Sequence, residues 1–403
     1  MSRRVIAVIT AGFFTVFTAY GIRYMYGVLL PKMLPALEIN KAEAGIIYAS
    51  YFIAYTIFSP ILGLMADRLS IRLILTAFPA MLCLGTFLMS YSSSLLNSSL
   101  FFALAGLGSA ACWSPVMALI LRWVSDRRRG IALAITDMGS TSGILVWTWL
   151  MPYIVEASDW MAGWKSLAAM ALIATVLNAV LIKDKPLPES IHSPSTTINV
   201  SGEKTGYIYL KLLQNKMFWL IGLSYMLVGF SVLIPFTFLT AHAVETFQMP
   251  YQTAKWLIIV IAIFGLIGKL TIGYYSDVLG RIKMMILCSL LIAAGSFGIM
   301  LSNTILTLAI SCAIFGLGYG ALWAVYAAVA SDYFPKMYSG RIIGLWTVYL
   351  GIGSIVAPPL AGWTIDTTGS YAWAFLLTSV SAAISILLLF PLIKTRPHPG
   401  SNL

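Results

Sequence analysis

The sequence contains few charged residues and no cluster of metal-ligating side chains. Only 10% of its 403 residues are Asp, Glu, Lys or Arg, whereas about a quarter of an average soluble domain is charged. The three histidines lie far apart, and the four cysteines stand singly in apolar runs, at Cys83, Cys112, Cys288 and Cys312. Because a metal site or a catalytic centre needs such side chains close together, we expect no metal, no cofactor and no enzyme activity.

Hydrophobic residues make up 60% of the chain. A helix needs about 18 apolar residues or more to cross the hydrocarbon of a bilayer. Twelve such runs occur, at 5–30, 43–65, 72–92, 98–121, 130–153, 164–182, 217–245, 253–275, 284–301, 304–331, 341–365 and 372–393. The sequence therefore predicts an all-α membrane protein with twelve transmembrane helices.

The positions of the lysines and arginines explain why the chain has a net charge of +11. Of the 25 lysines and arginines, 19 lie at the termini or in the alternate connections that share their side of the membrane. Only four lie in the opposite connections: Lys32, Lys41, Lys165 and Lys255. Cytoplasmic segments carry the excess of Lys and Arg, so we expect a cell-membrane protein with both termini in the cytoplasm. Membrane topology accounts for the basic charge, and we expect no nucleic-acid partner.

The sequence repeats itself at an offset of 210 residues. The matching pairs include Gly85 and Gly295, Gly106 and Gly316, Gly108 and Gly318, Trp113 and Trp323, and Gly143 and Gly353. A repeat of six spans returns in the same orientation, which predicts two six-helix bundles related by a pseudo-two-fold axis along the membrane normal. We expect these bundles at 1–182 and 217–403, joined by a polar cytoplasmic linker at 183–216.

The connection from Gly273 to Arg281, with the sequence GYYSDVLGR, resembles the signature G-x-x-x-D-x-x-G-R of the major facilitator superfamily. The first copy of the repeat keeps the aspartate as Asp67, but Ser70 replaces the second glycine. The resemblance implies that Asp67, Asp277 and Arg281 are gating residues. In this superfamily they belong to a contact that latches the two halves together on the cytoplasmic side.

Other stretches resemble the monocarboxylate and oxalate/formate transporter branch of that superfamily. They are YGIRY at 20–24, RW at 122–123 followed by RRG at 128–130, and PPLAGW at 358–363 followed by Asp366 and GSY at 369–371. The resemblance implies a carrier whose eighth span holds a basic residue that meets the substrate carboxylate, and Lys269 stands at that place. Proton-coupled members carry an aspartate one turn earlier, where this chain has Gly265. Coupling to a proton or to a counter-anion is therefore left open.

Three charged residues lie deep within predicted spans, at Arg23, Asp137 and Lys269. A charge near the bilayer centre costs at least about 2.5 kcal/mol, so each needs a function or a partner. Arg23 lies about 12 Å along the helix from Pro31, where we expect the first span to end. We predict that Arg23, Tyr20 and Tyr24 bind a substrate carboxylate. The alternatives are an internal ion pair or a side chain that reaches the interface.

Asp137 and Lys269 lie at similar depths, about 10 Å and about 9 Å from the cytoplasmic ends of their spans. In the superfamily fold, the fifth and eighth helices face each other across the two halves. We therefore predict an ion pair that closes a cytoplasmic gate and competes with the substrate for Lys269. The alternative is that Asp137 contacts only the backbone or Arg129.

Trp113 and Trp323 occupy equivalent places in the two halves, after a Gly-Leu-Gly sequence in each. This equivalence makes both of them candidates for substrate binding, with helix packing as the alternative. The combined reading is a secondary active transporter of a small organic anion, a monocarboxylate or a short dicarboxylate, which works by alternating access as a monomer surrounded by lipid. The alternative function is a carrier or exporter of a neutral or cationic small molecule.

Overall fold

The computed structural model describes residues 3–65, 69–124, 128–183, 214–334 and 339–395, and every regular element in it is a helix. In chain order these are α1 (Arg3–Leu37), α2 (Lys41–Met65), α3 (Ile71–Met89), α4 (Leu95–Ser109), α5 (Ser114–Trp123), α6 (Arg129–Ala157), α7 (Trp160–Leu181), α9 (Lys216–Glu245), α10 (Tyr251–Leu279), α11 (Arg281–Leu301), α12 (Ile305–Tyr333), α13 (Ser339–Thr368), α14 (Ala372–Leu389) and the short 3₁₀ helix η4 (Phe390–Leu392). With α4 and α5 counted as one span, the described residues hold 12 helices long and apolar enough to cross a membrane. The prediction of a multi-pass, all-α membrane protein is confirmed.

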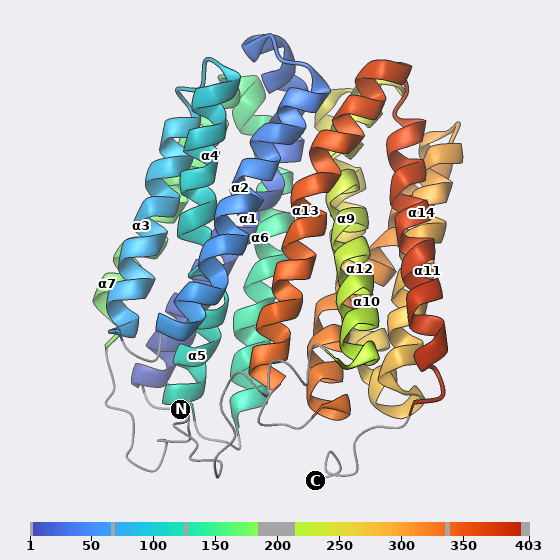
Figure 1. Cartoon of the computed structure of the whole chain (residues 1–403). Helices are drawn as coiled ribbons and strands as arrows, with labels where there is room; N and C mark the ends of the chain where they lie inside the picture. The colour runs from blue at the N-terminus through green and yellow to red at the C-terminus, as the bar shows by residue number, and fades with distance from the viewer. Residues whose placement is uncertain (1–2, 66–68, 125–127, 184–213, 335–338, 396–403) are drawn as a thin grey trace.

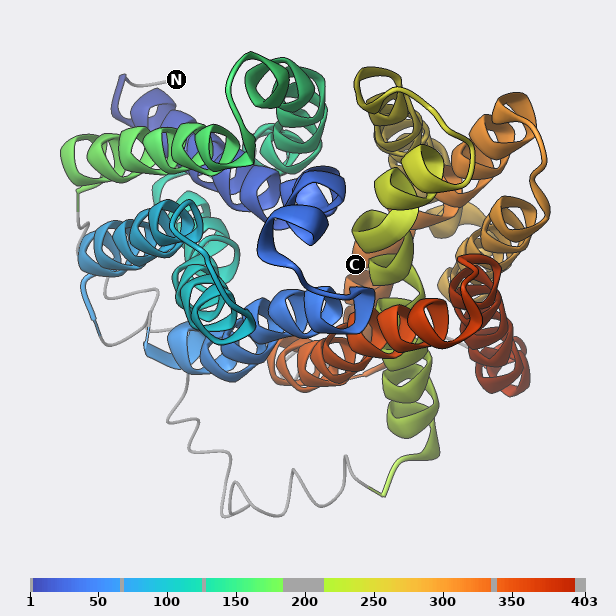
Figure 2. The ribbon, with the colours of Figure 1, turned by 90° about the horizontal axis from the view of Figure 1, so that it is seen from above.

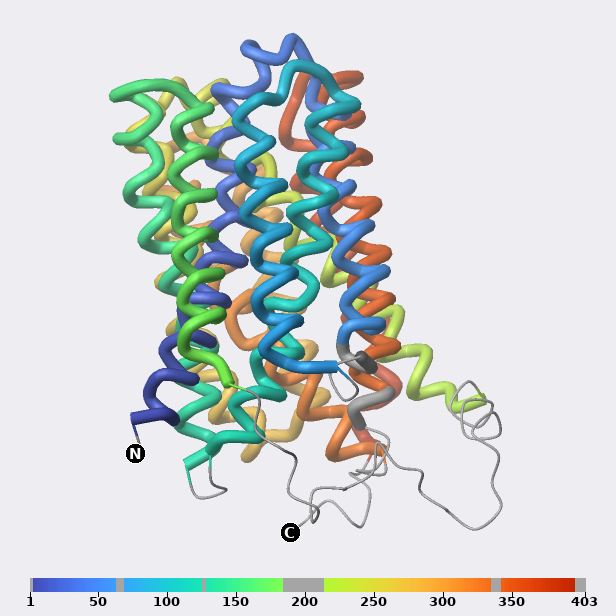
Figure 3. Tube along the Cα trace, turned by 90° about the vertical axis from the view of Figure 1, so that its left-hand side faces the viewer, coloured from blue at the N-terminus to red at the C-terminus, as the bar shows by residue number. Residues whose placement is uncertain are grey.

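The helices form two groups that lie side by side (Figure 2). One contains α1 to α7 and the other α9 to α14, and they meet mainly where α2 contacts α13, α1 contacts α9 and α6 contacts α10. Most of the predicted linker at 183–216 lies outside the described residues. Figures 1 and 3 show that α1 begins and α14 ends at the same end of the molecule, which we call the lower end. The opposite end is the upper end.

Glycines repeat the same packing contacts in both groups of helices. Gly106 of α4 packs on the backbone of Tyr51 in α2, and Gly316 of α12 packs on the backbone of Ile261 in α10. Both members of the second contact stand 210 residues after their counterparts. A Cβ atom at either glycine would overlap with the facing backbone, so these positions set the close approach of the helices. The sequence repeat is therefore also a repeat of packing.

Helix α1 is longer than the sequence predicted. The first span was expected to end at Pro31, but the helix continues through Pro31 and Pro35 to Leu37. A proline removes one backbone hydrogen bond, and in membrane helices the packing of neighbouring helices makes such a loss tolerable. Arg23 therefore lies about 21 Å along the helix from the upper end of α1.

The fourth span is broken in its middle, where the sequence predicted one continuous run. α4 ends at Ser109, and α5 begins at Ser114 with Pro115 in its first turn. Proline cannot donate the helical hydrogen bond and disfavours helical geometry in the residue before it. The equivalent residue in the second half is Val325, and α12 runs through it without a break. The break places Trp113 on irregular backbone in the middle of the span.

Candidate functional site

Arg23 lies in the middle of α1 and is surrounded by aromatic rings. Its guanidinium carbon lies 4.9 Å from the ring centre of Tyr20 and 4.5 Å from that of Tyr55. The rings of Tyr51 and Phe52 lie 5.5 Å away, and Arg23 Nε donates to the Tyr51 hydroxyl at 3.4 Å. Only 7% of the residue is exposed. Arg23 is therefore a buried cation held against the faces of aromatic rings, which attract it.

Arg23 has no acidic partner among the residues that the structure describes. The sequence holds 14 aspartates and glutamates, and Asp137 is the one that lies deep in a span. That carboxylate pairs with Lys269. A guanidinium presents five N–H groups, and the hydrogen-bond partners of Arg23 within the described ranges are the hydroxyls of Tyr51 and Tyr24. The internal ion pair considered from the sequence is thus not found there, and no acidic side chain within the described ranges compensates the charge of Arg23.

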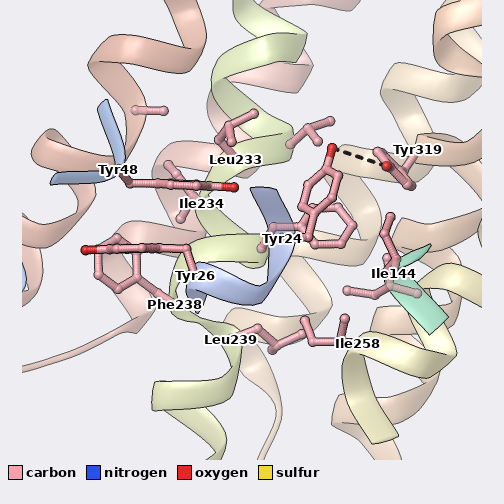
Figure 4. Close-up of a cluster of buried hydrophobic side chains, with 14 of the residues drawn as sticks. Tyr24, Tyr26, Tyr48, Ile144, Leu233, Ile234, Phe238, Leu239, Ile258 and Tyr319 are labelled. Carbon is pink, nitrogen blue, oxygen red and sulfur yellow. Dashed lines mark hydrogen bonds between the residues drawn. The ribbon is translucent and has the colours of Figure 1, made fainter. Parts of the chain in front are cut away.

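Tyr24 joins the two groups of helices next to Arg23. Figure 4 shows its hydroxyl pointing at that of Tyr319 on α12, which donates to it at 3.3 Å. The ring of Tyr24 also lies 4.3 Å from that of Phe236 on α9. The two halves therefore meet beside Arg23, where movement of one half against the other changes the surroundings of the guanidinium.

Trp113 and Trp323 both lie close to this meeting point. The ring of Trp113 is 5.9 Å from that of Tyr20, and the ring of Trp323 is 5.9 Å from that of Tyr225 on α9. Both tryptophans are partly exposed although they lie in the middle of their spans. Tyr51, Tyr55 and Tyr225 also belong to this cluster, although none of them was a candidate from the sequence.

Asp137 of α6 and Lys269 of α10 form an ion pair that connects the two groups of helices. Their side chains are 22% and 30% exposed, respectively, so neither is fully buried. Arg129, the alternative partner of Asp137, donates to the backbone carbonyls of Val124 and Leu121. The pair expected from equal depth and opposite charge is present, while its role as a gate stays a prediction.

The signature residues of the second copy contact one another and the end of α12. Arg281 pairs with Asp277, four residues before it, and with Asp332 at the end of α12, at 2.9 Å. All three belong to the second half, so within the described ranges Arg281 does not latch the two halves together. Gly280 adopts a φ of 100°, a conformation that favours glycine. Asp67, the counterpart in the first half, lies outside the described residues.

The upper end holds a contact between the halves that the sequence analysis did not predict. The carboxylate of Asp366 on α13 accepts from the backbone N–H groups of Lys41 and Ala42, at 3.2 Å and 2.8 Å, and so caps the start of α2. Lys41 also pairs with Glu245 of α9 at 3.0 Å and lies over the ring of Tyr371. Burial, together with the nearby carboxylates, raises the pKa of Tyr371, which keeps its hydroxyl neutral. We call this group the upper lock.

Other contacts between the halves also lie towards the upper end. Tyr251 donates to the carbonyl of Val28 at 2.9 Å, Lys255 donates to the carbonyl of Trp149 at 3.3 Å, and Gln252 bonds to Glu156. Within the described ranges, the polar contacts between the halves that lie below this end are Tyr24 to Tyr319 and Asp137 to Lys269. The upper side is therefore closed in this conformation.

We expect Asp366→Ala to weaken the upper lock. Loss of a charged cap at a helix start costs about 1–2 kcal/mol, which shifts the population towards the open upper side by roughly fivefold to thirtyfold. The measurement is the rate at which an impermeant maleimide modifies a cysteine placed at Val28, in a chain whose four cysteines are replaced by alanine. Val28 is fully buried in the closed form, so its modification reports opening.

The matched control is Glu43→Ala. Glu43 accepts from the backbone N–H of Asn40 at 2.9 Å, at the same end of α2, but this contact stays within one half. In this variant we expect the cysteine at position 28 to be modified at nearly the same rate as in the protein with Glu43 and Asp366 unchanged. If both changes accelerate the modification equally, the first turn of α2 frays in each variant. Asp366 would then not be a contact that holds the halves together.

The comparisons agree with this architecture. The sequence profile of the Major Facilitator Superfamily matches residues 12–254 and 221–403. Monocarboxylate transporter 12-B of Danio rerio is 24% identical over 84% of this chain and 76% of its own, and the hexuronate transporter of Bacillus subtilis (strain 168) is 22% identical over 92% and 90%. The inward-facing, unoccupied crystal structure of a bacterial homologue of the human lysosomal transporter Spinster superposes with a TM-score of 0.82, at 13% identity, over 99% of this chain and 100% of that one. At this identity the likeness to a solved structure shows the fold alone.

Proposed function

This chain belongs to the Major Facilitator Superfamily, and we propose that it is a secondary active carrier of a small organic anion that works by alternating access. The observation that carries the proposal is Arg23, a buried cation in the middle of α1 with no acidic partner in the described part of the chain. A substrate carboxylate supplies the missing negative charge and fits the planar guanidinium with two hydrogen bonds. The relatives named for monocarboxylates and hexuronates also act on acids.

The break between α4 and α5 supports a binding site at the same place. In secondary transporters, interrupted helices at the middle of the membrane commonly form the substrate site. Trp113 lies at this break, and its ring contacts that of Tyr20, which in turn contacts the guanidinium of Arg23. The proposed site therefore consists of Arg23, Tyr20, Tyr24 and Trp113 from the first half and Trp323 from the second.

We place the lower end in the cytoplasm, because 19 of the 25 lysines and arginines belong to the termini and connections of that side. The upper lock then faces the outside and is closed in this conformation. Asp137 and Lys269 act as the gate between the site and the cytoplasm, since they form the ion pair that connects the halves below Arg23. Rocking of the halves opens one side as the other closes.

Uptake into proteoliposomes tests the proposal. A panel of labelled carboxylates, their neutral amides and primary amines of similar size is offered with and without an imposed pH gradient. We expect saturable uptake of carboxylates, and the response to the gradient identifies proton coupling or its absence. Saturable uptake of amides or amines, with carboxylates neither carried nor competing, would overturn the assignment to anions.

A further inference from the structure

We propose that the substrate is a monoanionic aromatic acid, a flat ring that carries one carboxylate. This inference rests on the anion-carrier function proposed above and narrows its substrate class. It is carried by a row of aromatic side chains that crosses from one half to the other beside Arg23. We call this row the aromatic belt, and its members in spatial order are Trp113, Tyr20, Tyr24, Tyr319, Trp323 and Tyr225.

Successive rings of the aromatic belt lie close enough to contact one another. The distances between their centres, from Trp113 to Tyr225, are 5.9, 6.1, 6.5, 6.3 and 5.9 Å. Aromatic pairs attract each other at centre distances of about 4.5–7 Å. The step from Tyr24 to Tyr319 is the one that crosses between the halves, and their hydroxyls are hydrogen-bonded. A ring bound beside Arg23 thus meets aromatic surface from both halves.

The exposure of the belt separates its packing members from its accessible members. Tyr24 and Tyr319 are buried, at 3% and 7% exposed, and they hold the halves together. Tyr20, Trp113, Trp323 and Tyr225 are partly exposed although they lie in the interior of their spans. These four rings pack against the buried core, and part of each is left uncovered by protein. The accessible rings are therefore available to a substrate, two of them in each half.

The charge at the site sets the number of carboxylates that it accepts. Arg23 carries one positive charge that no acidic group compensates within the described ranges. Lys269, the other cation deep in a span, is neutralised by Asp137. A monoanion leaves the site neutral, whereas a dianion leaves one negative charge unpaired, which is costly in an environment of low polarity. This count selects the monocarboxylate over the short dicarboxylate.

Competition for uptake of labelled 3-phenylpropionate tests the inference. The competitors are unlabelled 3-phenylpropionate, 3-cyclohexylpropionate with a ring of similar size and no aromatic face, phenylsuccinate with two carboxylates, and the neutral 3-phenylpropanamide. We expect 3-phenylpropionate to compete at about tenfold lower concentration than the cyclohexyl acid, since two aromatic contacts together account for about that factor. We expect phenylsuccinate to be weaker by about tenfold or more, and the amide not to compete.

Two variants connect the preference to the belt. Trp323→Leu removes an accessible ring, and we expect the preference for the aromatic acid over the cyclohexyl acid to fall to about threefold or less. Trp373→Leu is the matched control, because Trp373 is 53% exposed at the start of α14 and stands outside the belt. We expect this variant to keep the full preference.

The outcomes separate the two proposals. If both acids compete equally and the amide does not, the carrier is selective for anions and the aromatic inference is wrong. If phenylsuccinate competes as well as 3-phenylpropionate, the charge count is wrong. If the neutral amide inhibits the uptake as strongly as unlabelled 3-phenylpropionate does, the site does not require an anion and the anion-carrier function itself fails. If 3-phenylpropionate is not carried while short aliphatic acids are, the aromatic inference is likewise overturned.

Discussion

Arg23→Gln is expected to reduce carboxylate uptake by about 100-fold or more. Each hydrogen bond to a charged group contributes about 1.5–3 kcal/mol, and a bidentate carboxylate pair makes two of them. Arg23→Lys keeps the charge but loses the flat fork of donors, so we expect an intermediate uptake. Initial rates in proteoliposomes, measured at several substrate concentrations, give the change in Vmax/KM.

The stability of the same variant distinguishes binding from folding. The cost of a charge near the bilayer centre is at least about 2.5 kcal/mol, and attraction to four aromatic rings, at about 0.5–1 kcal/mol each, offsets most of this. Removing the charge should therefore leave the stability of the substrate-free protein within about 1.5 kcal/mol of its original value. Thermal unfolding in detergent checks this. A variant that loses both uptake and stability would indicate that Arg23 is structural.

Lys165→Gln provides the matched control for the loss of a cation. Lys165 is exposed on α7, with its ammonium over the ring of Tyr91, and it lies apart from Arg23 and its aromatic neighbours. We expect this change to leave the rate of uptake within about twofold of the unaltered protein, since exposed charges contribute little. A loss comparable to that of Arg23→Gln would mean that overall charge, and not the site, governs uptake.

The second large effect is expected at the ion pair between Asp137 and Lys269. Either Asp137→Asn or Lys269→Gln leaves the other charge unpaired within the membrane. Because both side chains are partly exposed, the cost is discounted to about 1–2 kcal/mol, and we expect the turnover to fall by roughly fivefold to thirtyfold. Initial rates at saturating substrate measure this turnover.

The double variant shows whether the two residues act together. Residues that act as a pair give losses that do not add, with coupling energies of about 0.5–3 kcal/mol. We therefore expect Asp137→Asn combined with Lys269→Gln to be no slower than the worse single variant, because it leaves no unpaired charge. Normal transport by Asp137→Asn alone would end the gate proposal. Additive losses would mean that Lys269 and Asp137 have separate roles.

Several features of the fold could be predicted from the sequence because they depend on local composition. A span across the bilayer needs a long apolar run, and lipid leaves no other way to satisfy the backbone. The glycine repeat at an offset of 210 residues predicted two related bundles of helices, and the packing of Gly106 on Tyr51 recurs at the same offset as that of Gly316 on Ile261. The pairing of Asp137 with Lys269 followed from equal depth, opposite charge and the resemblance to a known fold.

Features that depend on the packing of distant segments could not be predicted in this way. Pro31 lies inside a helix because the surrounding helices support it. Pro115 signals the break in the sequence, since proline interrupts a helix. The apolar residues on both sides of it nevertheless form one run that is long enough to predict a single continuous span. The upper lock connects Asp366 to a helix start more than 320 residues earlier, and no spacing within the sequence indicates that contact.

The sequence by itself determined that this protein crosses a membrane many times, that its two halves are related in sequence, and that three charged residues lie deep within its spans. Only the tertiary structure decided what those charges meet. Asp137 forms an ion pair with Lys269, whereas Arg23 lies against the rings of Tyr20, Tyr51 and Tyr55. The physical reason is that apolar length is a property of each segment alone. The face that a helix turns towards its neighbours depends on how all the helices pack together.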